Sequence, residues 1–409
     1  MKVLRNRNYR MWLIGLTVAH VGTWMQRIAQ DWLVLELTGE SGTALGIVTG
    51  LQFLPLLLLG PVGGVIADRF SKRRTLLCTQ AAVGACALAL GAAVLTGSAS
   101  IGIVYAVSAA LGVAAAVFHP TVQAFVVELV DRDDVPRAVA LSAAAFQAAR
   151  LVGPAVAGGA IVLGGTGPVF TAAALTVAFP IAALLRMDAS RLRPAPSAGG
   201  GPGMFAEGVR YALTAPQVRL LLLITLFTGA FAANTQVTTA LMATTEFGRG
   251  AGEFGLLGSL LAAGSLLGSA AVVLSGRSGP RFVAAAALAF CAANAASALA
   301  PGFGSFAAVL VAVGAAQLVF TTAANASLQL GADPRMRGRV MALFTMFMMG
   351  STPLGAPLLG VVADAVGARG ALLAGAGAAA AGVLIAAALL LPGAVRAARE
   401  SPHTESERT

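Results

Sequence analysis

The chain has 409 residues, of which 57% are hydrophobic and only 11% are charged, and its formal net charge is +10. A water-soluble domain carries about 25% charged residues, so this chain has too few charges to cover a soluble surface of its size. Apolar stretches long enough to cross a bilayer as a helix, about 20 residues each, recur along nearly the whole chain. These runs are continuous, whereas the strands of a membrane barrel would alternate apolar and polar residues. The composition therefore excludes a soluble protein and predicts an all-α membrane protein.

Twelve membrane-spanning helices are expected in chain order. If the chain crosses the membrane at the twelve ranges given at the end of this paragraph, Arg249 and Arg369 lie on one side of the membrane. Arg27 and Arg150 then lie inside spans. The remaining 23 of the 27 Lys and Arg residues lie on the other side. Because cytoplasmic loops carry the excess of basic residues, we expect both termini in the cytoplasm of a bacterial inner membrane, with the basic charge reflecting topology and not nucleic-acid binding. The expected spans are 11–37, 42–67, 75–97, 101–129, 135–164, 168–186, 218–245, 254–276, 282–300, 304–330, 338–364 and 370–392.

An internal repeat divides the chain into two halves. Residues 137–141 (Arg-Ala-Val-Ala-Leu) recur at 339–343 (Arg-Val-Met-Ala-Leu), and Gly158 recurs as Gly360 at the same offset of 202 residues. One class of transporter is built from two such parallel repeats, with the substrate bound near the midplane between them; chance similarity in a chain rich in Ala and Gly is the alternative. We therefore expect two pseudo-symmetric six-helix halves, at 1–186 and 218–393. A flexible linker rich in Pro, Gly and Ser joins them at 187–217, and a cytoplasmic tail follows at 394–409.

The loop after the second span combines small, acidic and basic residues. Gly64 permits close helix approach, and Asp68 follows it four residues later, before the basic residues Arg69 and Arg73. An aspartate at a helix end can accept backbone N–H bonds from a facing helix N-terminus, so this loop is a candidate conformational latch. The alternative is an ordinary basic cytoplasmic loop, which explains the basic residues but neither Asp68 nor its spacing from Gly64.

This loop resembles the motif G-x-x-x-D-R-x-G-R-R of the major facilitator superfamily, with Ser71 in place of the second glycine. In the fifth span, Gly153, Pro154 and Gly158 resemble the Gly-Pro motif of exporters in that superfamily. Together with the run from Trp24 to Thr38, they resemble the branch of transmembrane secretion effectors that includes the enterobactin exporter and bacterial drug effluxers. The resemblance implies the major facilitator fold, a monomer, and an antiporter that exports a drug, a siderophore or a secondary metabolite. The second-half counterpart of the loop, residues 275–281, lacks the acid.

The first span contains buried charge. His20, Trp24, Arg27 and Asp31 fall on one stripe of the predicted helix. A charge inside a membrane costs several kcal/mol, so such residues face a cavity or a partner. Our hypothesis is that Asp31 carries the coupling proton, with Arg27 and His20 as the other proton-coupling candidates. The alternative is a permanent structural ion pair between Arg27 and Asp31.

Polar residues in four spans are candidates for a substrate cavity. Arg150 in the fifth span could bind an anionic group or pair with Asp31 within the first half; the alternative is that it snorkels to the interface or caps a neighbouring helix. Polar groups in the second half are neutral and suit an organic molecule, although hydrogen bonds between helices explain them equally well. With Trp24, the cavity candidates are Gln147, Arg150, Asn234, Gln236, Gln317 and Asn325.

Signatures of catalysis are missing from the sequence. The three histidines are scattered, and the chain contains no paired-cysteine or metalloprotease motif and no P-loop. We therefore expect no enzyme activity, no cofactor and no metal, and an ion gradient as the energy source. The predicted function is proton-coupled efflux of a small organic compound by alternating access, with the substrate, protons and the lipid bilayer as partners. The alternatives are a metabolite importer or facilitator, and a transport-inactive membrane sensor or assembly factor.

Overall fold

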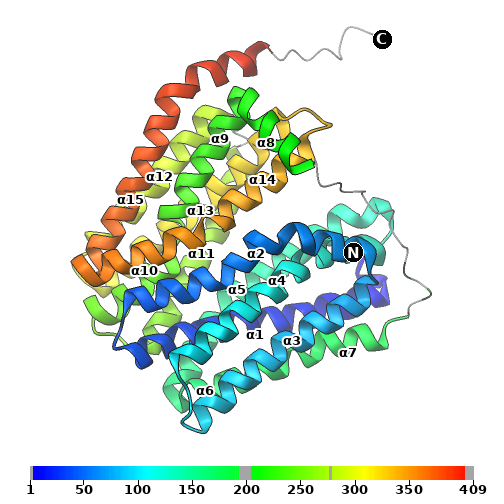
Figure 1. Ribbon diagram of the computed structural model, residues 1–409, viewed down its shortest axis with the longest axis vertical. Helices are drawn as coiled ribbons and strands as arrows, with labels where there is room; N and C mark the ends of the chain where they lie inside the picture. The colour runs from blue at the N-terminus through cyan, green and yellow to red at the C-terminus, as the bar shows by residue number, and fades with distance from the viewer. Residues whose placement is uncertain (1–2, 189, 191, 193–203, 276–278, 401–409) are drawn as a thin grey trace.

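The computed structural model describes residues 3–188, 190, 192, 204–275 and 279–400, and within those ranges it contains helices and no strand (Figure 1). The helices of the first half follow the predicted spans closely. They are α1 (Arg7–Thr38), α2 (Gly42–Arg69), α3 (Lys72–Leu95), α4 (Ile101–Leu129), α5 (Val135–Gly164), α6 (Thr166–Thr176) and α7 (Ala178–Arg186).

The second half is built similarly, except that its first span is broken. Two π-helical turns, Thr228–Ala232 and Met242–Glu246, flank the short helix α10 (Thr235–Leu241). The other helices are α8 (Met204–Thr214), α9 (Pro216–Phe227), α11 (Ala251–Ser275), α12 (Pro280–Ala298), α13 (Phe303–Gly331), α14 (Arg337–Gly350) and α15 (Thr352–Glu400).

Ten stretches are long and apolar enough to cross a membrane. One of them, Arg337–Leu390, holds two crossings, because Gly367 breaks its helix with a φ of 81°. Helix α1 is a further crossing: it has 32 residues and lies beside α5 and α6, and its polar side chains account for its lower hydropathy. Within the described ranges the chain therefore makes the twelve crossings that the sequence predicts.

The predicted repeat is visible in the backbone. Gly165 ends α5 with a φ of 76°, and Gly367, 202 residues later, has a φ of 81°. In each of these spans, a glycine also packs closely against the other half. Gly158 of α5 faces the start of α11, and Gly360 of α15 faces Gly42 at the start of α2. The two halves are thus pseudo-symmetric, and these glycines let the helices approach each other closely.

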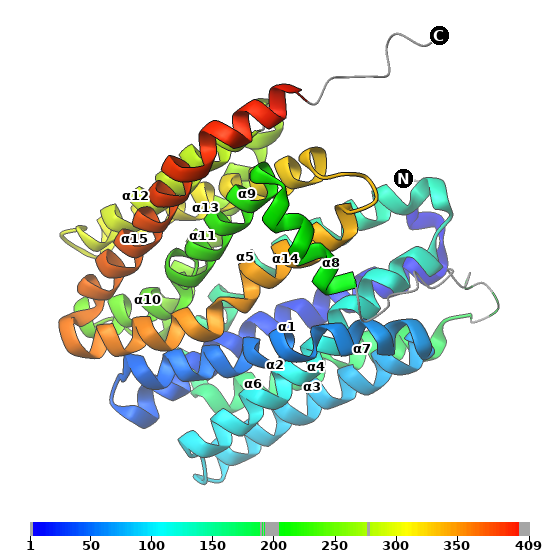
Figure 2. The ribbon, with the colours of Figure 1, turned by 45° about the horizontal axis from the view of Figure 1, so that its top comes forward.

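The two halves meet at one end of the bundle and separate toward the other (Figures 1 and 2). At the closed end, α2 lies along α15 and α5 lies along α11. An apolar core shared by both halves fills this end and includes Leu35, Val48, Leu241, Phe254 and Ala356. Toward the open end each half has its own core, around Trp12 and Phe125 in the first half and around Leu221, Phe320 and Leu343 in the second.

Helical structure extends into two regions that the sequence analysis treats as linker and tail. Helix α8 lies within 187–217, and its Glu207 carboxylate pairs with Arg339 of α14 at 2.8 Å. The Tyr211 hydroxyl accepts a hydrogen bond from the backbone N–H of Asp333. Amphipathic α8 therefore packs against the second half. Helix α15 continues to Glu400, while residues 276–278 of the second-half loop and 401–409 of the tail lie outside the described residues.

Adjacent glycines on α5 give a matched test of the closed end. A Cβ at Gly158 would lie 2.7 Å from the Ala251 carbonyl oxygen, whereas one at Gly159 would meet open space. We expect Gly158→Val to lower stability by about 1–3 kcal/mol through overpacking. Gly159→Val makes the same change in helix propensity without the clash and is the control. Thermal unfolding of both variants in detergent measures the difference, and equal midpoints would contradict the packing described here.

Candidate functional site

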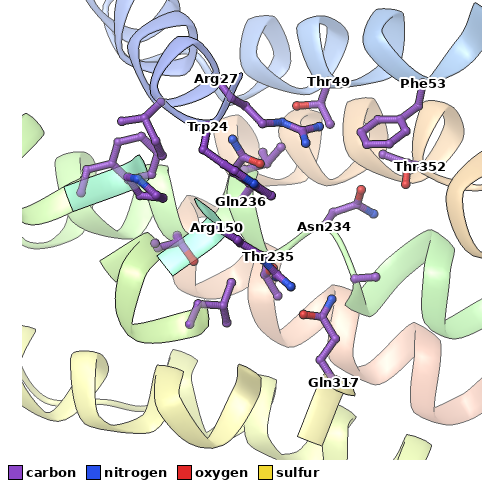
Figure 3. Close-up of a pocket in the computed structure, with 18 residues that line it drawn as sticks. Trp24, Arg27, Thr49, Phe53, Arg150, Asn234, Thr235, Gln236, Gln317 and Thr352 are labelled. Carbon is purple, nitrogen blue, oxygen red and sulfur yellow. The ribbon is translucent and has the colours of Figure 1, made fainter. Parts of the chain in front are cut away.

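A cavity lies between the two halves, directly beyond the shared core (Figure 3). Helices α1, α2 and α5 form one wall, and α10, α11, α13 and α15 form the other. Its volume is about 810 Å³, the solvent at its mouth included. The polar and aromatic residues that line it are Trp24, Arg27, Thr49, Phe53, Arg150, Asn234, Thr235, Gln236, Thr239, Phe254, Gln317 and Thr352.

Two guanidinium groups share one aromatic ring in the first-half wall. The Cζ atoms of Arg27 and Arg150 lie 5.6 and 5.7 Å from the centroid of the Trp24 ring (Figure 3). Arg27 also lies over Phe53 at 5.1 Å and donates a hydrogen bond of 3.1 Å to the Gln52 side chain. Cation–π contacts of this kind orient a guanidinium without neutralising it.

Asp31 is next to the cavity and is almost fully buried, at 2% exposure. Its carboxylate accepts a short hydrogen bond from the Gln236 side chain of α10, so this contact joins the two halves. The ion pair between Arg27 and Asp31 that the sequence suggested as an alternative does not form among the described residues. Instead, Arg27 donates a hydrogen bond to Gln52, and Asp31 accepts one from Gln236.

The broken span supplies the polar groups of the second-half wall. Between the π turn and α10 the backbone leaves the helix, and the Asn234 amide donates a hydrogen bond to the freed carbonyl of Ala230 at 2.6 Å. Interrupted helices expose polar backbone and side chains at membrane depth where they line a cavity. Across the cavity, the buried Oε1 of Gln317 has no hydrogen-bond partner among the described residues.

Three of the predicted residues lie away from the cavity. His20 packs edge-on against Phe146, at 5.1 Å between ring centroids. It is eleven residues from Asp31, or about 16 Å along the helix. Gln147 is half-buried on α5 outside the lining, and Asn325 of α13 accepts a hydrogen bond from Gln329 one turn further along. The structure brings six predicted residues to the cavity lining, and these three lie outside it. The six are Trp24, Arg27, Arg150, Asn234, Gln236 and Gln317.

The Gly-Pro residues of α5 pack against α1 and α11. A Cβ at Gly153 would meet the Trp24 side chain, and one at Gly158 would meet the backbone of α11. Pro154 lines the cavity and its carbonyl faces Gly255. The Ala155 N–H, directly after Pro154, donates a hydrogen bond to Ser259 Oγ of α11 at 3.1 Å. This element therefore shapes both the closed end and the cavity floor.

The predicted latch residues at the end of α2 separate into two groups. Asp68 and Arg69 are exposed and make no hydrogen bond or ion pair among the described residues, and a Cβ at Gly64 would meet open space. Arg73, in contrast, donates to the carbonyls of Leu184 and Leu185 at 2.7 and 3.1 Å, and so caps the end of α7.

At the opposite end of α2 an aspartate from the other half is engaged. Asp364 of α15 accepts hydrogen bonds from the backbone N–H groups of Gly42 and Thr43 at 2.6 and 2.9 Å, and from the Ser41 hydroxyl at 3.2 Å. Asp364 was not among the predicted residues. The signal was present, because Gly-Val-Val-Ala-Asp at 360–364 matches Gly-Val-Ile-Ala-Asp at 64–68. It went unnoticed because it does not follow the repeat offset.

Two pseudo-symmetric six-helix halves around a polar cavity are typical of transporters of the major facilitator type. The family model described as transmembrane secretion effector matches residues 1–408. The chain belongs to that family, and it is a transporter and not an enzyme.

One curated relative is the staphyloferrin A transporter of Staphylococcus aureus, which is 33% identical over 141 residues. The match spans 34% of this chain and 35% of the length of that relative.

Solved transporter structures are similar over almost the whole chain. A POT family transporter in complex with a thioalcohol-conjugated peptide has a TM-score of 0.75 at 11% identity, covering 95% of this chain and 96% of that one. A bacterial homologue of the human lysosomal transporter Spinster has a TM-score of 0.68 at 16% identity, covering 95% and 98%. At these identities the likeness concerns the fold alone.

The contact between Asp31 and Gln236 can be tested by a double-mutant cycle. We expect Gln236→Leu to destabilise the protein by about 1–3 kcal/mol, because it leaves a buried carboxylate without its donor. In an Asp31→Leu background the same change is expected to cost less. Gln147→Leu, which removes a half-buried glutamine outside the cavity, is the control and should change stability by no more than about 0.5 kcal/mol. Additive effects in thermal unfolding would contradict the contact.

Proposed function

We propose that this transporter exports a small organic compound by alternating access and is driven by protons. The observation that carries the proposal is the bond between Asp31 and Gln236, a buried carboxylate bonded across the two halves beside a polar cavity. The Gly-Pro element of α5 and the description of the family as secretion effectors support export. Uptake or facilitated diffusion of a metabolite is the competing outcome of the test below.

Protonation of Asp31 is the proposed link between the ion gradient and the conformation. A hydrogen bond to an ionised acceptor is roughly twice as strong as one between neutral groups. Gln236 therefore holds the closed end more firmly when Asp31 is charged, and uptake of a proton weakens that hold. Arg27, four residues away on the same helix, is a charged neighbour of Asp31.

Two matching aspartates are the proposed latches of the two end states. Asp364 caps the start of α2 and holds the closed end. Asp68, at the far end of the same helix, has no hydrogen bond or ion pair with any described residue and is proposed to engage when that end closes in turn. A carboxylate at a helix N-terminus is favoured by both the free N–H groups and the helix dipole. One helix would then be held at alternate ends in alternate states.

The orientation follows from the charge distribution. Under the positive-inside rule the termini and the loop that contains Asp68 face the cytoplasm. The closed end is then periplasmic, and the cavity opens to the inside of a bacterial cell membrane. We propose a monomer as the working unit, because the cavity is formed within one chain.

The role of Asp31 can be tested by the accumulation of fluorescent compounds in an efflux-deficient bacterium. The compounds are ethidium, Nile red and 3-hydroxy-2-naphthoate, which are cationic, neutral and anionic. We expect wild-type protein to lower the accumulation of at least one of them, and Asp31→Asn or a protonophore to abolish the effect. Asp133→Asn, in an exposed loop, is the control. Higher accumulation with the wild type would indicate uptake, and full export by Asp31→Asn would remove Asp31 from the coupling path.

The latches can be tested by thiol labelling at Thr49→Cys, after Cys78, Cys86 and Cys291 have been replaced. We expect Asp364→Asn to raise the labelling rate by a membrane-impermeant maleimide added outside the cell roughly tenfold, since a helix cap is worth about 1 kcal/mol or more. Asp68→Asn is the matched variant and should lower the rate, because it weakens the opposite state. Changes in the same direction in both variants would contradict alternate latching.

A further inference from the structure

The cavity has an unbalanced charge. Among the described residues that line it, Arg27 and Arg150 are cationic and none is acidic. Both lie in membrane-spanning helices, where a charged side chain normally pairs with an opposite charge or faces water. Two like charges beside one aromatic ring repel each other, and only an anion placed between them or next to them relieves that repulsion.

The protein groups that contact these guanidiniums are all neutral. Arg27 donates to the Gln52 amide and lies over the rings of Trp24 and Phe53. The guanidinium of Arg150 lies over the Trp24 ring. Amide oxygens and aromatic faces attract a cation but leave its charge in place. The planar donors of a guanidinium match a carboxylate in bidentate geometry, and those of Arg150 are not used by any described hydrogen bond.

The buried acid nearby makes no direct contact with either arginine. Asp31 does not line the cavity, its carboxylate is bonded to Gln236, and it forms no ion pair with either arginine in the described part of the chain. Asp364 accepts hydrogen bonds from the backbone at the start of α2, at the closed end. Asp31 therefore offsets at most the charge of Arg27, and no described acid balances Arg150. An anion from outside the protein can supply the missing counter-charge.

We propose that the compound carried by this transporter is an organic anion. Its carboxylate-like group binds the guanidiniums of Arg27 and Arg150, and its flat apolar part lies against Trp24 and Phe53. This inference rests on the proposed function for the direction of movement, but the ligand class itself rests on the charge of the cavity. A membrane potential that is negative inside favours the outward movement of an anion, which is consistent with export.

The opposite wall adds a second requirement. Gln317 Oε1 is buried at the cavity without a hydrogen-bond partner in the described structure, and an amide oxygen can only accept. A buried acceptor left unsatisfied is costly, so a ligand that donates a hydroxyl or amide hydrogen at this position gains affinity. The expected ligand therefore combines an anionic end toward the first half with a neutral donor toward the second.

Binding of matched probes to the purified full-length protein in a neutral detergent tests the ligand class. Calorimetry compares 3-hydroxy-2-naphthoate with its neutral amide, 3-hydroxy-2-naphthamide, and with 2-naphthoate, which lacks the hydroxyl donor. We expect the amide to bind at least about tenfold more weakly, the range for losing a hydrogen bond to a charged group. We also expect 2-naphthoate to bind more weakly than the hydroxylated acid, and Gln317→Leu to remove that difference. Sulfate at equal ionic strength is the inorganic competitor.

Substitutions of the two arginines test where the carboxylate of the probe binds. Arg27→Gln and Arg150→Gln are each expected to weaken the binding of 3-hydroxy-2-naphthoate at least about tenfold and to leave the amide unchanged. Arg150→Lys keeps the charge and should retain binding tighter than Arg150→Gln. Arg337→Gln removes an exposed arginine at the start of α14 and is the control.

Equal or tighter binding of the amide would overturn the proposal, and this comparison needs only the wild-type protein. Displacement of the naphthoate by sulfate would also overturn it, because the site would then take an inorganic anion. The assay uses no ion gradient, so the proposed function can fail independently. Selective binding of the acid without export would contradict the direction or the coupling and leave the ligand class intact.

Discussion

The hydrogen bond between Asp31 and Gln236 is the interaction on which this account depends. It places a carboxylate at 2% exposure and ties α1 of the first half to α10 of the second. A buried ionised group is tolerated only where hydrogen-bond partners compensate for the lost water. Asp31 can therefore stay buried and charged only while the two halves meet at the closed end and Gln236 reaches it. The bond thus links a chemical state, the protonation of one side chain, to the relative placement of the two halves.

The close packing around this bond explains why it forms. Glycines let α5 approach α11 and α15 approach α2, so the shared apolar core excludes water from the closed end. The same approach brings Asp364 to the start of α2. Beyond the core, the break between α9 and α10 leaves Asn234 and Gln236 exposed to the cavity. Small residues at the helix contacts and polar residues at the break therefore position the cavity between the halves.

Hydropathy and the repeat were sufficient to predict the fold. Each predicted span is helical, although three of them are divided between two or more helices. Length, apolar character and positive loop charge are local properties of a membrane segment and can be read from the sequence. The cavity was predicted in part. Trp24, Arg27, Arg150, Asn234, Gln236 and Gln317 line it, since a charged or amide group inside a span has few other places to lie.

The partners of those groups could not be predicted. That Asp31 bonds Gln236 and not Arg27 depends on how the two halves are placed, and no spacing along the chain encodes it. Asn325 has the same residue type as Asn234, yet it lies two turns of α13 beyond Gln317 and bonds Gln329 instead. The cap by Asp364 likewise required two distant segments to meet.

The most direct test of the central claim is the distance across the closed end as a function of pH. Spin labels at Leu163→Cys and Val366→Cys, in a chain without its three native cysteines, report that distance for the substrate-free protein. The account predicts that acidification populates a longer distance in the wild type. Asp31→Asn, which imitates the protonated acid, should give the longer distance at every pH. A pH response that is unchanged in Asp31→Asn would contradict the link between the protonation of Asp31 and the opening of this end.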